Sequence, residues 1–449
     1  MNNLMGILMM VMFFFMYIWM LDEILYQMIY QNMILLLMLM MLLFYSFNEL
    51  NFWLKIYYMV GVDGYSMGLI LLSVWIIQLM VMVSGKNLYL SNFKLLMLLI
   101  NMMLLILILS FSMINLMMFY IMFESSLIPI FLMILGWGGQ VDRIEAGLFM
   151  MIYTLIGSLP LLFMIIYLNN YKKTLMMDIV IFGFMSGWVY IFSMMAFLIK
   201  LPMFMVHIWL PKAHVEAPVM GSMILAGVML KLGSYGIFRV VVMMKELCLK
   251  YNKFLITYML LGGVYSSLIC LCQVDMKSLV AYSSIVHMSL LMSGLLTMMS
   301  WGYNGGYLMM ISHGLCSSGL FCLVNINYER TLSRSLIINK GMMNYFPSLS
   351  LMWFLLCSSN MSFPPSLNLL SEIMLVNSLI MWSKLISLII VVMLFFSASY
   401  TLYLFSYSQH GKINSMNLMM KSIKVLEYFI LLMHWLPLNV MFLFINMFM

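Results

Sequence analysis

The residues of this chain that could do chemistry are ionisable side chains set within long apolar runs. A small group stands out: Glu124, Lys200, His207, Lys231, His287, His313 and Glu372. A charge at the centre of a lipid bilayer costs about 2.5–3.5 kcal/mol on insertion scales, so such residues are functional candidates by default. Carboxylates, amines and imidazoles can each take up and release a proton. Their positions therefore predict a proton pathway.

Glu124 and Lys200 are predicted to act as a charge pair. Glu124 lies in the apolar run MINLMMFYIMFESSLIPIF, and Lys200 lies two residues before Pro202. The affinity of a lysine for its proton depends on burial and on a nearby carboxylate, so a lysine whose partner comes and goes can act as a switch. The alternatives are a protonated glutamic acid bonded to a neighbouring helix and a lysine that extends to the membrane interface.

Lys231 is predicted to be the central relay residue. It lies in the middle of VMGSMILAGVMLKLGSYGIFR, where Gly227, Ser234 and Tyr235 share its helical face. A face of small and polar residues suits close packing or a water-filled cavity rather than contact with lipid. The alternative is a lysine that only packs one helix against another.

The histidines of the candidate group lie within or at the edge of apolar runs: His207, His287 and His313. Ser283 and Ser284 share the predicted helical face of His287, and Cys316 and Ser317 share that of His313. Histidine titrates near neutral pH, which favours a hydrated relay. A lone histidine in an apolar helix is more often a packing residue, and no common zinc spacing is present.

The elements that must position these residues are membrane-spanning helices. The chain has 449 residues, 65% hydrophobic and 8% charged, with a mean hydropathy of +1.09. Recurring apolar runs of about 20 residues predict an all-α polytopic membrane protein with about 14 transmembrane helices. The predicted spans are 3–20, 28–47, 62–84, 93–112, 114–135, 145–168, 182–209, 218–240, 255–273, 279–298, 302–325, 347–380, 386–408 and 424–446. Lys212, His214 and Glu216 are assigned to a loop.

Prolines break two of these spans and suggest an internal symmetry. Pro202 lies in the first, and Pro364 and Pro365 lie in the second, with Glu372 one to two helical turns beyond. Proline removes a backbone donor, which a membrane tolerates only where protein or water satisfies the freed groups. Because the broken spans are the seventh and the twelfth, corresponding helices are offset by five spans, an odd number, and two inverted repeats of about five helices are predicted, at 93–240 and 255–408. The alternatives are two unrelated kinked helices and, for Glu372, a carboxylate at a helix end.

Three helices in 1–92 and one in 409–449 are predicted to flank these repeats. The 61 methionines are typical of an AT-rich organelle gene in which AUA encodes methionine. The net charge of +7 comes from lysines and arginines scattered over many loops with no basic cluster, which argues against a nucleic-acid site. Fourteen spans place both termini on one side, and a slight excess of lysine and arginine in the loops of the other side predicts that the termini face the intermembrane space. The six cysteines include no CxxC pair, and no haem, flavin, iron–sulfur or phosphate-binding motif is present.

Six runs of the chain are distinctive: HIWLPKAHVEAPVMGSMILAGVMLKLGSYGIFR, FYIMFESSLIPIF, VDMKSLVAYSSIVHMSLLMSG, ISHGLCSSGLFCLVNINYER, PPSLNLLSEI and FFSASYTLYLFSYSQHGK. These runs closely resemble the antiporter-like, Mrp-type subunits of NADH:ubiquinone oxidoreductase (respiratory complex I), in the form of mitochondrially encoded chain 4. Chain 5 of the same assembly is longer and ends in a lateral helix, and chain 2 lacks the HxWLPKAHVEAP wording. Both therefore fit less well.

The resemblance implies a proton-translocating subunit of the membrane arm, in which Glu124 and Lys200 form the charge pair and Lys231 the relay. His207, His287 and His313 continue the hydrophilic axis, and Glu372 closes it. The chain is then an enzyme only as part of H+-translocating NADH:ubiquinone reductase. FMN, iron–sulfur clusters and ubiquinone belong to other subunits, and this chain has no cofactor. The implied partners are other membrane-arm subunits, chiefly chains 2 and 5, and lipids such as cardiolipin, in the mitochondrial inner membrane.

Two alternative functions also fit the composition. One is a free-standing cation/proton antiporter subunit of the related bacterial family, against which the methionine content argues. The other is a structural scaffold of the membrane arm in which the buried charges are inert. Variants that assemble but do not move protons distinguish the pump from the scaffold.

Overall fold

The computed structural model describes residues 10–12, 23–46, 59–85, 92–177, 187–412 and 421–444, which are helical apart from their connections. Within these residues, ten segments are long and apolar enough to cross a membrane. A helix satisfies its backbone polar groups internally, as a lipid environment requires. The chain is therefore an all-helical polytopic membrane protein. The predicted span at 3–20 lies outside the described residues except for 10–12.

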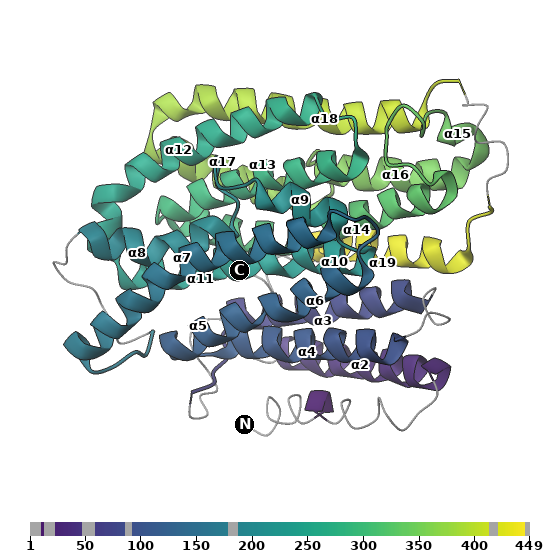
Figure 1. Ribbon diagram of the computed structural model, residues 1–449. Helices are drawn as coiled ribbons and strands as arrows, with labels where there is room; N and C mark the ends of the chain where they lie inside the picture. Colours follow the sequence, from purple (N-terminus) through teal and green to yellow (C-terminus); the bar gives the residue numbers. More distant parts are fainter. Residues whose placement is uncertain are drawn as a thin grey trace. The chain divides into compact units, whose positions relative to one another are not determined.

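The described residues form two compact units. The first unit takes its residues from Met1–Lys200 and Glu216–Leu247, and the second from Leu201–Val215 and Cys248–Ile445. The helices of the first unit are α2 (Glu23–Ser46), α3 (Gly64–Ser84), α4 (Phe93–Ser112), α5 (Leu116–Ser125), α6 (Leu127–Trp137), α7 (Arg143–Lys172), α8 (Gly187–Lys200), α10 (Val219–Ile224), the π-helical turn η2 (Leu225–Met229) and α11 (Leu230–Met243). Within it, α3 packs against α2 and α4, and α8 packs against α7 and α11 (Figure 1).

The second unit is built around one long buried helix. Its helices are α9 (Trp209–Glu216), α12 (Lys245–Leu271), α13 (Met276–Leu296), α14 (Ser300–Thr331), α15 (Met342–Tyr345), α16 (Pro347–Asn360), α17 (Leu367–Trp382), the short η3 (Lys384–Ile386), α18 (Ser387–Gln409) and α19 (Val425–Leu443). The central helix is α14, which is buried continuously from Gly305 to Asn327. It packs against α13, α16, α17 and α19 (Figure 1). Polar side chains on α14 are therefore shielded from lipid.

The predicted span 114–135 is divided at Ser126 into α5 and α6. The cause is Pro129, which has no N–H and cannot bond the carbonyl of Ser125 one turn earlier. The Ser126 hydroxyl donates to the carbonyl of Phe123 at 2.7 Å. As a result, Glu124 lies in the last turn of α5, where backbone carbonyls have no partner within their own helix.

Two interrupted helices occur where the prolines predict them. The first is α8, which ends at Lys200, and the chain becomes helical again at Trp209. The second lies between Asn360 and Leu367, and it contains a cis peptide bond between Pro364 and Pro365. The amide of Asn368 donates to the Ser359 carbonyl at 2.7 Å, so part of the broken backbone is satisfied by a side chain.

Two sequence assignments of loops were wrong. Residues 209–216 form α9, because Pro211 lies in its first turn, where proline needs no backbone donor. The predicted span 255–273 begins ten residues earlier, at Lys245. Lys245 and Lys250 are exposed while Leu247 is buried, so the first turns of α12 are amphipathic. Their charged residues lower the average hydropathy, and the sequence analysis therefore missed these turns.

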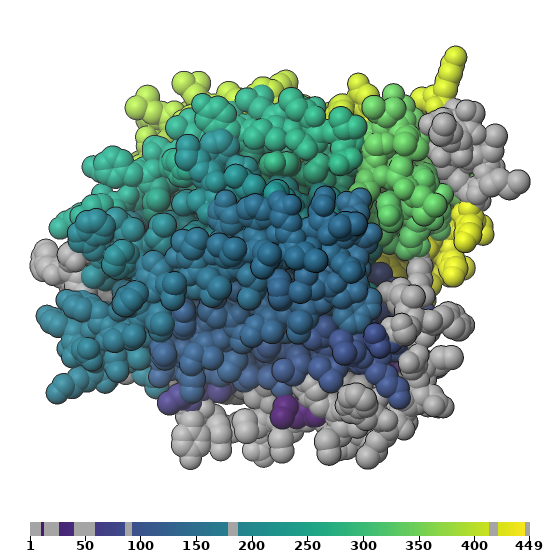
Figure 2. Space-filling view, in the orientation of Figure 1, coloured from purple at the N-terminus to yellow at the C-terminus, as the bar shows by residue number. Residues whose placement is uncertain are grey.

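The outer helices expose apolar side chains, as expected of a protein surrounded by lipid or by other subunits. On α7 the exposed large apolar residues are Ile144, Leu148, Ile152, Leu155, Ile156, Leu159, Phe163 and Ile166. These residues extend along most of α7. Its side chains, coloured blue, form part of the surface in Figure 2. Such an extended apolar surface is incompatible with exposure to water.

Close packing of α8 against α11 depends on a glycine. A Cβ added at Gly236 would overlap the ring of Phe197, which is itself held by Phe119 and Phe123. We expect Gly236→Ala to destabilise the protein by about 1–3 kcal/mol through overpacking. The measurement is the thermal inactivation midpoint of the assembled protein in membranes. Gly136→Ala is the matched control because a Cβ there meets open space, and equal midpoints for the two variants would contradict the expectation.

Candidate proton-handling sites

Glu124 brings a buried carboxylate to the end of α5. Its two carboxylate oxygens are shielded from solvent, and neither has a hydrogen-bond partner of standard geometry among the described residues. The hydroxyl of Ser158 on α7 lies close enough to interact with the carboxylate, and Lys200 interacts with it electrostatically. The structure therefore brings together the two residues that the sequence pairs.

Lys200 is the last residue of α8 and is only 2% exposed. Its ammonium does not rest on Glu124. Instead, Nζ donates to the carbonyl of Phe123 at 2.7 Å and lies 3.2 Å from the centroid of the Phe123 ring. A cation at the carboxyl end of a helix also interacts favourably with the helix dipole. Lys200 is thus held by Phe123, the residue next to its predicted partner Glu124.

Lys231 is fully buried at the start of α11. The π-helical turn η2 comes directly before it, and its Nζ donates to the carbonyl of Ala226 in that turn at 2.6 Å. Such turns widen the helix and frequently occur at functional sites. The predicted polar face is partly occupied by structural bonds, because Ser234 donates to the Lys231 carbonyl at 3.1 Å and Tyr235 to the Phe111 carbonyl at 3.0 Å.

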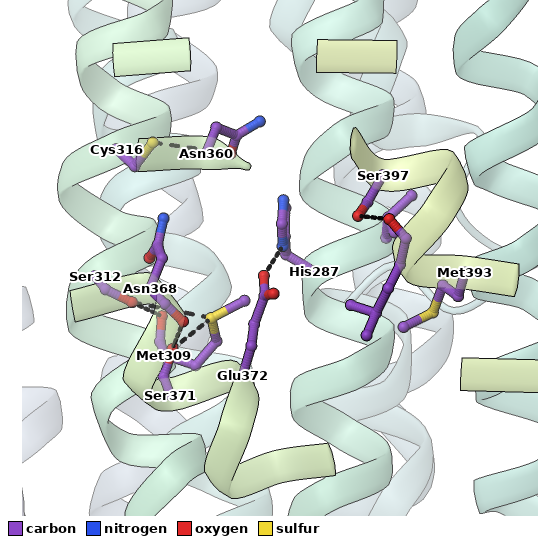
Figure 3. Close-up of polar contacts among 12 residues, drawn as sticks. His287, Met309, Ser312, Cys316, Asn360, Asn368, Ser371, Glu372, Met393 and Ser397 are labelled. Carbon is purple, nitrogen blue, oxygen red and sulfur yellow. Dashed lines mark hydrogen bonds and ion pairs between the residues drawn. The ribbon is translucent and has the colours of Figure 1, made fainter. Parts of the chain in front are cut away.

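A second cluster of ionisable groups lies in the second unit. His287 Nδ1 of α13 lies 3.4 Å from Glu372 Oε1 of α17, as the dashed line in Figure 3 shows. The other ring nitrogen, Nε2, lies 3.4 Å from the hydroxyl of Tyr400 on α18. The ring centroids of His287 and His313 are 5.6 Å apart. Three helices thus surround α13 at this level and provide a carboxyl, a phenol and a second imidazole.

The side chains around Glu372 come from the broken helix and from α14 (Figure 3). One turn before Glu372, Asn368 bonds the end of α16, and Ser371 Oγ lies 3.2 Å from the sulfur of Met309. Above them in Figure 3, Cys316 Sγ lies 3.8 Å from Asn360 Oδ1. The serines beside His287 take no part, because Ser283 and Ser284 bond carbonyls of their own helix.

His207 lies in the turn between α8 and α9 rather than in a helix. Its ring stacks on Phe204 at 5.3 Å and meets Tyr282 edge-on at 5.9 Å. Its Nδ1 is buried and has no hydrogen-bond partner among the described residues. The histidine is therefore placed as an aromatic packing residue that retains one unused polar atom.

Several buried charged or polar groups escaped the sequence reasoning. Arg239, at the end of the predicted span 218–240, is a residue of α11 whose side chain is 12% exposed and forms an ion pair with Asp63 at the start of α3. Lys277, assigned to a loop, is 5% exposed and donates to the Val215 carbonyl at 3.4 Å. Tyr400 and the fully buried His434 were not singled out. The sequence could have indicated His434, because it is an ionisable residue within an apolar run. It could not have indicated Tyr400, because a tyrosine is common in such runs.

The fold and the buried ionisable residues define a polytopic membrane protein that carries groups able to exchange protons. A family model described as NADH:quinone oxidoreductase/Mrp antiporter, TM, matches residues 113–399. A second, described as NADH-ubiquinone oxidoreductase chain 4, amino terminus, matches residues 4–111. The chain belongs to the NADH-ubiquinone oxidoreductase chain 4 family, and is an antiporter-like membrane subunit of that kind.

One relative supports the family, and two solved structures share the fold. The chain is 52% identical over 398 residues to NADH-ubiquinone oxidoreductase chain 4 of Ceratitis capitata, covering 88% of this chain and 89% of that one. A chain of respiratory complex I from Thermus thermophilus shares the fold, with a TM-score of 0.87, 23% identity, and coverage of 99% and 96%. A chain of the Mrp complex from a Dietzia species aligns with a TM-score of 0.73 and 15% identity, with coverage of 79% and 68%.

Proposed function

We propose that this chain translocates protons as a membrane-arm subunit of NADH:ubiquinone oxidoreductase and couples electron transfer from NADH to ubiquinone to pumping across the mitochondrial inner membrane. The observation that carries the proposal is that each unit buries its own set of groups able to exchange protons. Glu124, Lys200 and Lys231 lie in the first, and the His287–Glu372 pair lies in the second. Ionisable groups buried at such a cost are rarely inert in a membrane.

The proposed mechanism changes the partner of each charge in turn. When Lys200 leaves Phe123 and approaches Glu124, the electrostatic field at Lys231 changes, and so does the proton affinity of each group. Each 1.36 kcal/mol of altered interaction changes a pKa by about one unit. Moving a proton against the membrane potential costs about 2.3 kcal/mol per 100 mV. Changes of a few pKa units are therefore sufficient to move a proton against the membrane potential. Redox chemistry in other subunits supplies the energy for them.

The proposal extends to the architecture. About fourteen helices are expected, with three in 1–92, inverted repeats at 93–240 and 255–408 and one helix in 409–449. Support comes from the interruption after α8 and the interruption between α16 and α17, which fall in different repeats. With fourteen spans both termini lie on the same side, and the slight bias of lysine and arginine toward the loops of the other side favours the intermembrane space for the termini.

The proposed partners are the other membrane-arm subunits, chiefly the antiporter-like chains 2 and 5, together with lipids such as cardiolipin. The exposed apolar surface of helices such as α7 supports both kinds of contact. In the proposed assembly FMN, iron–sulfur clusters and ubiquinone are held by other subunits. The chain then contributes proton handling and no electron transfer of its own.

Removing the charge of Glu372 tests the proposed function. We expect Glu372→Gln to lower NADH-driven proton uptake into inside-out membrane vesicles by about tenfold, because His287 loses its anionic partner. Native gels should show normal assembly, since glutamine keeps the shape of the side chain. Glu246→Gln is the control because Glu246 is exposed on α12. Normal proton uptake by an assembled Glu372→Gln variant would favour the scaffold function instead.

A further inference from the structure

Lys200 and Phe123 form a cation–aromatic contact within the first unit. Both side chains are almost completely buried, with Lys200 2% and Phe123 1% exposed. The ammonium lies against the ring face, 3.2 Å from its centroid, and donates to the carbonyl of the same residue at 2.7 Å. Glu124, the next residue, accepts no hydrogen bond of standard geometry from the described residues. The lysine is thus engaged by the neighbour of the carboxylate.

The Phe123 carbonyl is available because of how α5 ends. It lies in the last turn of the helix, where carbonyls lack partners within the helix, and Ser126 also donates to it at 2.7 Å. The negative end of the helix dipole adds to its attraction for a cation. A neutral amine would gain much less from this position than an ammonium.

The ring itself is fixed by its neighbours. Phe123 meets Phe197 edge-on at 5.5 Å and Phe119 at 5.8 Å, and Phe119 also contacts Phe197 and Tyr235. These residues form an aromatic cluster (Phe119, Phe123, Phe197 and Tyr235) contributed by α5, α8 and α11. Because these rings pack around Phe123, turning its ring away from the end of α8 would displace them.

We propose that Phe123 is a positioning residue that holds the charged form of Lys200 beside Glu124 without letting the two charges pair. An aromatic face attracts a cation through its quadrupole and attracts a neutral amine far less. The ring and carbonyl therefore stabilise protonated Lys200 in a waiting position, from which a small movement reaches the carboxylate. This inference rests on the proposed function, since it assigns a position to a lysine of that pathway.

A double-mutant cycle in the assembled complex tests the proposal. The variants are Phe123→Leu, Lys200→Met and the combination, and the readout is protons moved per NADH oxidised in sealed vesicles. We expect Phe123→Leu to lower this yield about threefold, because the cation loses its aromatic face. The combination should be no worse than Lys200→Met alone, since the ring then has no cation to position. Phe123→Tyr keeps the ring and should retain most of the yield.

Phe119→Leu is the matched control, because Phe119 belongs to the same aromatic cluster and its loss disturbs packing to a similar degree. Equal yields in assembled Phe119→Leu and Phe123→Leu, or additive effects of Phe123→Leu and Lys200→Met, would overturn the role of Phe123. If Phe123→Leu does not assemble, Phe123→Met replaces it with the same expectations. A normal yield in assembled Lys200→Met would instead overturn the proposed pathway, so the two failures are distinguishable.

Discussion

Replacing Arg239 by methionine is expected to prevent most of the complex from accumulating. Arg239 forms a buried ion pair with Asp63 and lies over the ring of Tyr235, 4.9 Å from its centroid. Removing one partner of a buried pair leaves an uncompensated charge, at a cost of about 3–5 kcal/mol. Asp63 is also the N-cap of α3, where it accepts from the Ser66 N–H at 2.8 Å. The loss therefore loosens both α3 and α11.

The amount of assembled complex on native gels measures this effect. Adding Asp63→Asn to Arg239→Met should recover much of the complex, because the amide carries no charge and can still cap the helix. Lys245→Met is the control, since Lys245 is exposed on α12. A wild-type amount of complex with Arg239→Met alone would show that the pair does not hold these helices together.

The second large effect is expected from Lys231→Met, which should lower the NADH-driven pH gradient by about tenfold or more. Methionine fills the space of lysine but cannot carry a proton, and Lys231 is fully buried. The carbonyl of Ala226 loses a donor, which costs about 1–3 kcal/mol, an amount that an assembled complex can tolerate. The gradient is measured with a pH-sensitive dye in vesicles. An unchanged gradient would mean that Lys231 is a packing residue.

Hydropathy predicts most of the fold because the described helices are apolar along nearly their whole length. The helix breaks near Pro202 and Pro364 are predictable because proline lacks the backbone N–H that a continuous helix needs, and prolines are visible in the sequence. Helix ends rich in charge are not predictable in this way. The first turns of α12 carry lysines on their exposed side, and an average over neighbouring residues reads them as a loop.

The candidate residues were found because a charge in an apolar run is conspicuous, but their partners depend on tertiary structure. Nothing in the spacing of Asp63 and Arg239 indicates that they meet across 176 positions. Similarly, Phe123 is one phenylalanine among the chain's 31, and only the packing of α8 against α5 makes it the residue that holds Lys200. Residue types therefore reveal which groups are unusual, and the fold decides what each one contacts.

The most direct test of proton handling by these buried groups is the number of protons moved per NADH oxidised by complexes that carry Lys231→Met. Vesicles with equal amounts of assembled complex are compared with wild type and with Lys212→Met, whose lysine is exposed on α9. A lower ratio for Lys231→Met, with the ratio of Lys212→Met unchanged, is the predicted result. Equal ratios in all three would contradict the role of Lys231 as the central relay of the proposed proton pathway.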